Sequence, residues 1–166
     1  FARSFFDAPG LCLPAVMSID GKPLGGYPMY SLSMTHHAWL CQAFDHYWRH
    51  TGDMDFLRER AYPYMKETAE CILRWLSPGD DGKLRLRLSS SPEIHDNSLR
   101  AWLTPNSNFD LSIIRYLFGT LAVMAETLEN GEVNRWQGVL GSCPELSINE
   151  SGVLMLSHDE SLAESH

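Results

Sequence analysis

The residues that could do chemistry gather in one polar stretch, residues 88–97, which reads Leu-Ser-Ser-Ser-Pro-Glu-Ile-His-Asp-Asn. Its central feature is Glu93, a carboxylate that follows a proline and lies near aromatic residues. Such a glutamate suits a general acid whose pKa is raised by partial burial. Polar loops between rigid elements often carry binding and catalytic residues. The same composition also fits a solvated connector, in which Ser, Asp and Asn side chains only satisfy the backbone.

A glutamate that acts as an acid needs a second group opposite it. Inverting glycoside hydrolysis uses the acid and a second carboxylate, about 6.5–9.5 Å away, which activates a water molecule. Asp96 is too close to Glu93 in sequence to lie reliably on the opposite face of a sugar, and Asp110 fits the first turn of a helix. Glu93 therefore predicts at most one half of such a site in this chain.

Other chemistries find little support in the residue pattern. His46 and His50 have a spacing that can chelate zinc on a helix, but the glutamate of metalloproteases is absent and no third ligand is marked. The serines before Pro92 lack a G-x-S-x-G elbow, and no glycine-rich phosphate motif is present. The cysteines form no C-x-x-C pair and are expected to be free, partly buried thiols: Cys12, Cys41, Cys71 and Cys143. We predict no metal and no cofactor.

The charge and composition of the chain exclude several partners. Its 166 residues carry a net charge of −8 without a Lys/Arg cluster, which argues against nucleic acid and anionic membranes as partners. No apolar run approaches the length that spans a bilayer. Aromatic residues make up 11% of the chain, including five Trp, and such rings either fill cores or stack on sugars.

Hydrophobic periodicity predicts long helices at residues 35–50, 54–76 and 109–129, and a short one at residues 132–140. We expect the second helix to kink or restart at Pro63, because proline lacks the backbone N–H that a helix interior needs. This pattern predicts an all-α fold built of helical hairpins, in which short turns join paired helices at one end and polar loops lie at the other.

Local signals mark the ends of these helices. Gly52 is expected to end the first helix, Asp53 to cap the second, and Asn108 to cap the third, with Asp110 in its first turn. Leucine alternates with Lys and Arg over residues 83–88, which predicts a half-buried strand that leads into the polar stretch.

The remaining segments are predicted to be loops. Residues 1–33 are rich in Gly and Pro, and we expect them to pack over one end of the helices and line a cleft. Short extended pieces are predicted at residues 15–19, 146–149 and 153–156. The first residue is not Met, and the apolar helix faces are wide, so we expect this chain to be a piece of a longer protein.

Several motifs together resemble glycoside hydrolase family 95. Residues 51–67 resemble its helix pair TGD-x-x-FL-x-ER-x-YP-x-x-KE, and Ser91-Pro92-Glu93 matches its Ser-Pro-Glu. Residues 110–118 resemble its D-x-x-I-I-R-x-L-F helix, and residues 26–40 resemble its WPMGGAWL stretch. The final Glu164-Ser165-His166 is similar to the approach to its His-Arg-His-x-Ser-His segment.

This resemblance implies a fold and a reaction. Residues 1–166 would be a partial (α/α)6 catalytic domain, incomplete at both ends, of an inverting α-L-fucosidase-like enzyme. Glu93 would be the general acid, and Trp39 and His166 would bind an oligosaccharide or glycan that ends in an α-linked sugar such as fucose or galactose. The water-activating Asn pair would lie upstream and the base Asp downstream, so the isolated chain is expected to be inactive. An extracellular or periplasmic location is compatible with the family.

Departures from the family pattern keep other functions open. The family usually has Asn after the glutamate, where this chain has Ile94 and His95, and it has Gly-Gly where this chain has His36 and His37. These changes concern the substrate more than the fold. The alternatives are a non-catalytic carbohydrate-binding or scaffolding helical toroid, and another six-hairpin enzyme such as an α-L-rhamnosidase or a phosphorylase.

Overall fold

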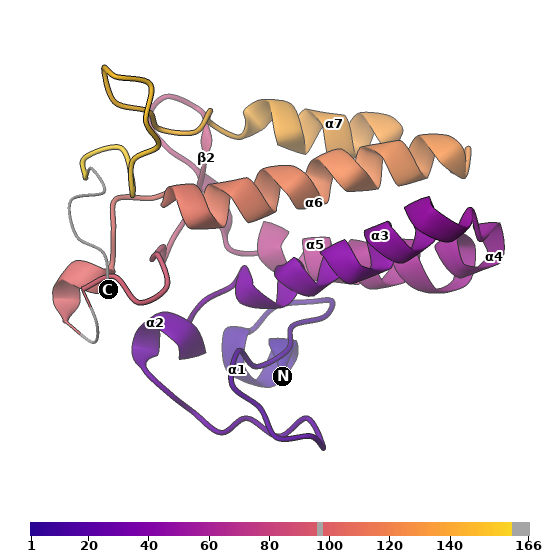
Figure 1. Ribbon diagram of the computed structural model, residues 1–166, viewed down its shortest axis with the longest axis horizontal. Coiled ribbons are helices and arrows are strands. Elements are labelled where there is room, and N and C mark those ends of the chain that lie inside the picture. Colours follow the sequence, from indigo (N-terminus) through magenta and orange to yellow (C-terminus); the bar gives the residue numbers. More distant parts are fainter. Residues whose placement is uncertain (96–97, 161–166) are drawn as a thin grey trace.

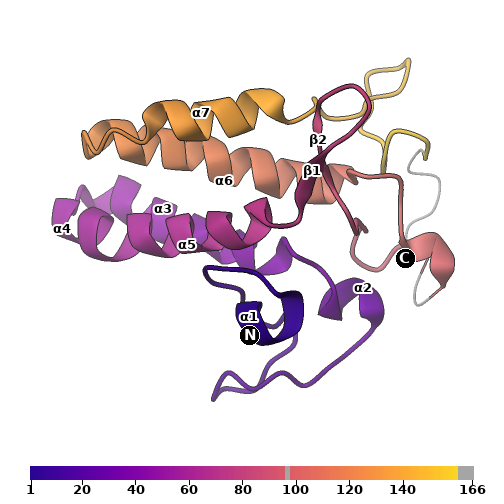
Figure 2. The same ribbon diagram turned by 180° about the vertical axis from the view of Figure 1, so that it is seen from behind.

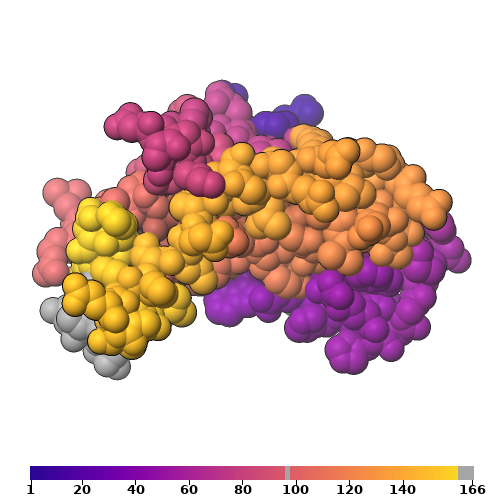
Figure 3. All heavy atoms as spheres, turned by 90° about the horizontal axis from the view of Figure 1, so that it is seen from above, coloured from indigo at the N-terminus to yellow at the C-terminus, as the bar shows by residue number. Residues whose placement is uncertain are grey.

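Two helical hairpins stacked in two layers form the body of the protein in a computed structural model that describes residues 1–95 and 98–160. One hairpin joins α6 (Asn108–Thr127) to α7 (Val133–Ser142), and the other joins α3 (Cys41–Thr51) to α5 (Tyr62–Leu73) (Figures 1 and 2). Seen from above, α6 and α7 cover much of the molecule (Figure 3). The predicted helical character is confirmed, with a small two-stranded sheet in addition.

The hairpins place their connecting turns at one end and their long loops at the other (Figure 1). The loop end gathers the strands, the segment before α6 and the segment after α7. Short helices complete the fold: α1 (Ala2–Phe6), α2 (Pro28–Ser31), the 3-10 helix η1 (His36–Leu40) and the 3-10 helix η3 (Leu99–Ala101). The predicted split between short turns and polar loops is therefore confirmed.

The first hairpin follows the sequence signals closely. Gly52 has φ 67°, and its N–H bonds to the Trp48 carbonyl, which ends α3. Asp53 caps α4 (Met54–Phe56) by accepting a 2.8 Å hydrogen bond from the backbone N–H of Phe56. The predicted first helix differs in one respect, because its first turn is the tighter 3-10 helix η1.

Instead of the predicted kink or restart at Pro63, the helix changes type just before this residue. Between α4 and α5 the chain forms one π-helical stretch, η2 (Leu57–Ala61), and Pro63 lies in the first turn of α5. A proline there lacks the N–H, and its ring presses on the carbonyl four residues earlier. A widened π turn relieves that contact without breaking the helical direction.

The sheet was only half predicted. Strand β2 (Leu84–Leu86) lies within the predicted strand and pairs antiparallel with β1 (Leu76–Pro78). The prediction that the helix continues to Leu76 is wrong, because α5 ends at Leu73 and Leu76 pairs with Leu86. The indole N–H of Trp75 bonds to the Phe6 carbonyl at 3.1 Å, so a tertiary contact holds the chain where the helix ends.

The cap of α6 is also a correction. Ser107, not Asn108, is the N-cap, and its hydroxyl accepts a 3.1 Å hydrogen bond from the Asp110 N–H. The Asn108 side chain instead donates to the carbonyls of Ser147 at 2.7 Å and Met155 at 2.8 Å. It thereby holds two of the predicted extended pieces, which meet at an isolated bridge, outside any named strand, between Ile148 and Leu154.

The core lies between the two hairpins. Its largest fully buried side chains include Trp136, Phe118, Leu57 and Met65. All four cysteines are free, as predicted, and fully rather than partly buried. Within residues 1–95 and 98–160, none of the helices combines the length and the apolar character needed to cross a bilayer.

Candidate functional site

The Ser-Ser-Ser-Pro-Glu segment leaves β2 and enters the loop end of the molecule. Ser89 and Ser90 are buried, Ser91 and Pro92 are half-buried, and Glu93 is exposed. The partial burial that we predicted for Glu93 is therefore wrong, because the residue is exposed. The segment places one carboxylate at the surface of an otherwise fixed loop.

The backbone around Glu93 is held in an uncommon conformation. Glu93 has φ 62° and His95 has φ 60°, both in the left-handed region that non-glycine residues seldom adopt. Each such residue costs on the order of 1–3 kcal/mol and persists only where its surroundings enforce it. The Ile94 N–H bonds to the Ser91 carbonyl at 3.3 Å, and the Ser98 N–H bonds to the His95 carbonyl at 3.2 Å.

His95 anchors this loop to another part of the chain. Its side chain is almost fully buried, and Nε2 hydrogen-bonds to the carboxylate of Glu160, 65 positions later. The contact ties the Glu93 loop to the segment after α7. Its neighbour Asp96 lies outside the described residues.

A row of aromatic rings connects Glu93 with Trp39. Tyr30 lies beside Glu93. Partial burial raises the pKa of Tyr30, the charge and side chain of Glu93 raise it further, and a backbone hydrogen bond with Glu93 lowers it. From Tyr30 the rings continue through His36 at 5.6 Å, Phe109 at 5.4 Å and finally Trp39 at 5.9 Å between neighbouring centroids. We call these four residues the aromatic row.

The aromatic row can receive the apolar face of a sugar. Trp39, at its far end, is 52% exposed, and its indole N–H bonds to Gln42 at 3.2 Å, which orients the ring. Tyr27 extends the row at the other end, with its ring stacked on Tyr30 at 6.4 Å. Sequence reasoning selected Trp39 and missed Tyr30 and Phe109. The crowding of aromatic residues after Gly26 was the available signal.

The two histidines that replace Gly-Gly have different environments. His36 belongs to the aromatic row, and burial lowers its pKa. His37 points into the core, where its Nδ1 lies 3.5 Å from the sulfur of Cys12. Burial lowers the pKa of His37 to about 4. Of the two, His36 therefore belongs to the candidate site and His37 to the core.

The low pKa of His37 predicts an acid-sensitive fold. A histidine in an unfolded chain has a pKa of 6.5. Below that pH His37 binds a proton in the unfolded chain, whereas in the folded chain it stays neutral down to about pH 4. Stability should fall over this window, by up to about 3 kcal/mol. In urea unfolding, the stability difference between wild type and His37→Gln should shift in favour of the variant between pH 7 and pH 4. A difference that stays constant would contradict the buried neutral state.

Other predicted positions do not join this cluster. His46 and His50 lie on exposed parts of α3, with ring centroids 6.3 Å apart. His166, predicted to bind substrate, lies outside the described residues. Among residues 1–95 and 98–160, no three His, Cys, Asp or Glu side chains are grouped closely enough to hold a metal ion.

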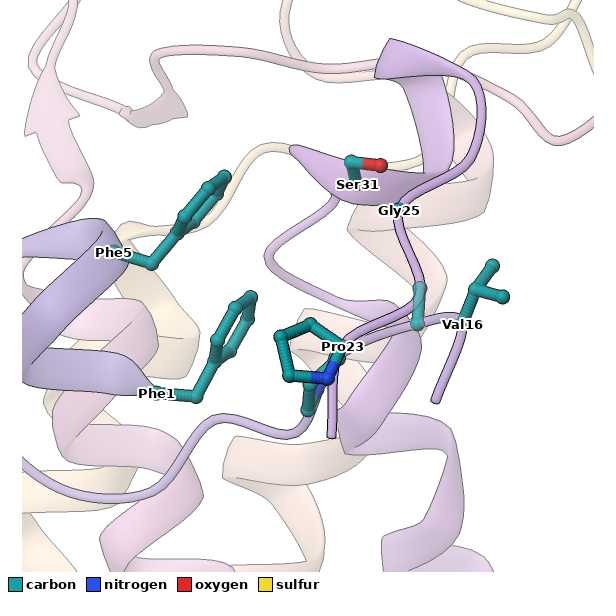
Figure 4. A pocket seen from close by; sticks show the side chains of 8 residues that line it. Phe1, Phe5, Val16, Pro23, Gly25 and Ser31 are labelled. Atoms are coloured by element: carbon teal, nitrogen blue, oxygen red, sulfur yellow. The ribbon is translucent and has the colours of Figure 1, made fainter. Parts of the chain in front are cut away.

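Two pockets contain neither Glu93 nor Trp39. The first, of about 150 Å³, is apolar, with the rings of Phe1 and Phe5 facing Pro23 and Val16 (Figure 4). The second, of about 310 Å³, is lined mainly by residues from the β1–β2 hairpin, the start of α6 and the segment after α7. Two of its carboxylates are engaged in ion pairs, Asp81 with Arg85 and Glu145 with Arg115. The exposed carboxylate and aromatic row remain the better candidate site.

Comparisons with known proteins identify relatives of this chain. The sequence model of the glycosyl hydrolase family 95 catalytic domain matches residues 1–164. Over 133 residues, or 76% of this chain, the sequence is 32% identical to Alpha-L-fucosidase 2 of Arabidopsis thaliana. The matched part amounts to 16% of the length of that relative.

Proposed function

Because the chain belongs to the glycosyl hydrolase family 95 catalytic-domain family, we propose that it supplies the acid half of an inverting glycosidase site. The proposed substrate is an oligosaccharide or glycan that ends in an α-linked L-fucose or a similar L-galactose unit. The other half of the site, with the base, would come from a longer protein that contains this chain.

The observation that carries the proposal is the exposed Glu93 next to the aromatic row. Ring faces at Tyr30 and Trp39 offer apolar surface to the C–H face of a sugar, while the carboxyl group of Glu93 offers a proton to the bond that breaks. Trp39 is half-exposed, as a stacking residue must be in order to meet a ligand.

In the proposed reaction, Glu93 donates its proton to the glycosidic oxygen as the bond to the anomeric carbon breaks. The leaving sugar departs as a neutral alcohol. A water molecule, activated by a base outside this chain, attacks the anomeric carbon from the opposite face. Attack on the opposite face inverts the configuration, so an α-fucoside gives β-fucose.

The fold supports a place for this chain in an (α/α)6 barrel. The two helices within each hairpin run antiparallel, and the long loops lie at one end, as repeated hairpins of a toroid require (Figure 1). Large apolar side chains remain exposed on both hairpins and on η1, including Tyr47, Val123 and Leu40. In the barrel, adjacent hairpins would cover such side chains.

The test uses the longer protein and a panel of 4-nitrophenyl glycosides: α-L-fucoside, α-L-galactoside and α-L-rhamnoside. We expect hydrolysis of the first two, with the β-anomer of the free sugar as the first product in ¹H NMR. An α-anomer as the first product would refute inversion. Hydrolysis of the rhamnoside alone would replace the proposed substrate, and binding of fucose without hydrolysis of any glycoside would favour the non-catalytic alternative.

A further inference from the structure

Asp110 is a buried carboxylate that sequence reasoning assigned only to the first turn of a helix. It is 2% exposed, and in the described part of the chain no Lys or Arg pairs with it. Burying a charge without a cation is costly unless hydrogen bonds replace the lost water. Burial raises the pKa of Asp110, and hydrogen bonds from Ser89, Thr35 and their neighbours oppose that effect.

Three donors from segments away from α6 surround its two oxygens, and the hydroxyl of the N-cap Ser107 lies 3.1 Å from Oδ2. The Thr35 hydroxyl donates to Oδ1 at 2.5 Å, the Ser89 hydroxyl donates to Oδ2 at 2.6 Å, and the Ser90 N–H donates to Oδ2 at 3.2 Å. Ser107 closes the arrangement, since its hydroxyl donates to the Ser90 carbonyl at 2.7 Å and its N–H donates to Ser89 Oγ at 2.7 Å. All of these residues are buried.

The carboxylate is not needed to cap α6. Ser107 already performs that role, and it does so by accepting from the Asp110 N–H, a backbone group that any residue except proline would supply. The side chain of Asp110 instead reaches out of its own helix to two other segments. Its hydrogen bonds therefore hold three segments together and are not needed to stabilise one helix end.

Those segments carry the candidate site. Thr35 directly precedes η1, which bears His36 and Trp39. Ser90 lies three residues before Glu93, and Asp110 follows Phe109 of the aromatic row. The start of α6, where Asp110 lies, is at the loop end of the molecule (Figure 1). One carboxylate thus links the Glu93 loop, the Trp39 segment and α6.

We propose that Asp110 is a positioning residue, which sets the place of Glu93 relative to the aromatic row by binding Thr35, Ser89 and Ser90. The inference rests on the proposed acid role of Glu93. An acid displaced by about 1 Å can lose on the order of 10²-fold in rate. Asp110 would act through Glu93 and would touch neither substrate nor water.

The test is Asp110→Asn in the longer protein, measured with two leaving groups. Asparagine keeps the shape, but its NH2 group donates and cannot accept, so one of the two positions that now accept hydrogen bonds is lost. On 2′-fucosyllactose, whose leaving sugar needs a proton, kcat should fall about 10- to 100-fold with little change in KM. On α-L-fucosyl fluoride, whose leaving group needs no proton, kcat should fall less than about threefold.

Asp45→Asn is the matched control. Asp45 is another buried carboxylate, held by Arg49 at 2.7 Å and by the Tyr116 hydroxyl at 2.8 Å, and it belongs to α3 away from the Glu93 loop. Any fall in kcat caused by Asp45→Asn should be the same for both leaving groups. If Asp110→Asn does not fold, Thr35→Val removes one donor with little change in shape, and Thr35→Ser, which restores the hydroxyl, should recover the rate on 2′-fucosyllactose.

The outcomes separate this inference from the proposed function. If Glu93→Gln leaves the hydrolysis of 2′-fucosyllactose intact, the proposed function fails. If Glu93→Gln abolishes this hydrolysis, Asp110→Asn tests the positioning role. That role is overturned if Asp110→Asn lowers kcat equally on both substrates, or lowers it on neither. Selective loss on 2′-fucosyllactose in Asp110→Asn, without such selectivity in Asp45→Asn, supports it.

Discussion

Replacing Glu93 with Gln should lower kcat/KM of the longer enzyme on 2′-fucosyllactose by about 10²–10⁴-fold. Glutamine has nearly the same size and keeps a hydrogen-bonding oxygen, but it cannot donate a proton to the leaving oxygen. Glu93 is exposed and lies on a loop fixed by buried serines, so the substitution should leave the fold intact. Initial rates and far-UV circular dichroism measure both effects.

The control for this variant is Glu126→Gln, which makes the same chemical change at an exposed position of α6, far along the helix from the Glu93 loop. We expect Glu126→Gln to keep wild-type activity. The Glu93→Gln defect should shrink on α-L-fucosyl fluoride, because fluoride leaves without a proton. If Glu93→Gln retains activity on 2′-fucosyllactose within about tenfold of wild type, Glu93 is not the acid.

Replacing Trp136 with Ala should destabilise the chain by about 3–5 kcal/mol. Trp136 is fully buried, and its ring centroid lies 6.0 Å from that of Phe118 between the hairpins. Its indole N–H donates to the Tyr62 hydroxyl at 2.9 Å, which in turn donates to Glu132 at 2.7 Å. The substitution therefore removes a large apolar group and one link of a hydrogen-bond chain. Urea unfolding of the 166-residue chain measures the loss.

Trp39→Ala provides the comparison, since it deletes the same side chain at a half-exposed position. Its cost in stability should stay near about 1 kcal/mol or below, because less apolar surface returns to water. Equal destabilisation by the two variants would show that Trp136 does not occupy the core in the way described.

Much of the helical framework could be predicted because its signals are local. The wide apolar face of residues 35–50, the left-handed Gly52 and the capping Asp53 each involve a few neighbouring residues. The interruption at Pro63 has the same origin, since the missing N–H and the ring act within one turn. Such features need no knowledge of the rest of the fold.

Other features depended on partners outside the local pattern that predicted them. Strand β1 forms only because β2 returns beside it, and Asn108 is drawn from the cap position to the carbonyls of Ser147 and Met155. Local patterns predicted a helix through Leu76 and an N-cap at Asn108 instead. Pairing with the next strand outweighed helix propensity in the first case, and hydrogen bonds to distant carbonyls outweighed capping preference in the second.

By itself, the sequence identified Glu93 and Trp39 as candidate site residues and determined most of the helices. Only the tertiary structure joined these two residues through Tyr30, His36 and Phe109. It also brought donors to the buried Asp110, whose hydrogen bond to Thr35 spans 75 positions. The physical reason is that a buried carboxylate must find its donors wherever the fold brings hydroxyl and N–H groups together, and no local pattern records which ones those are.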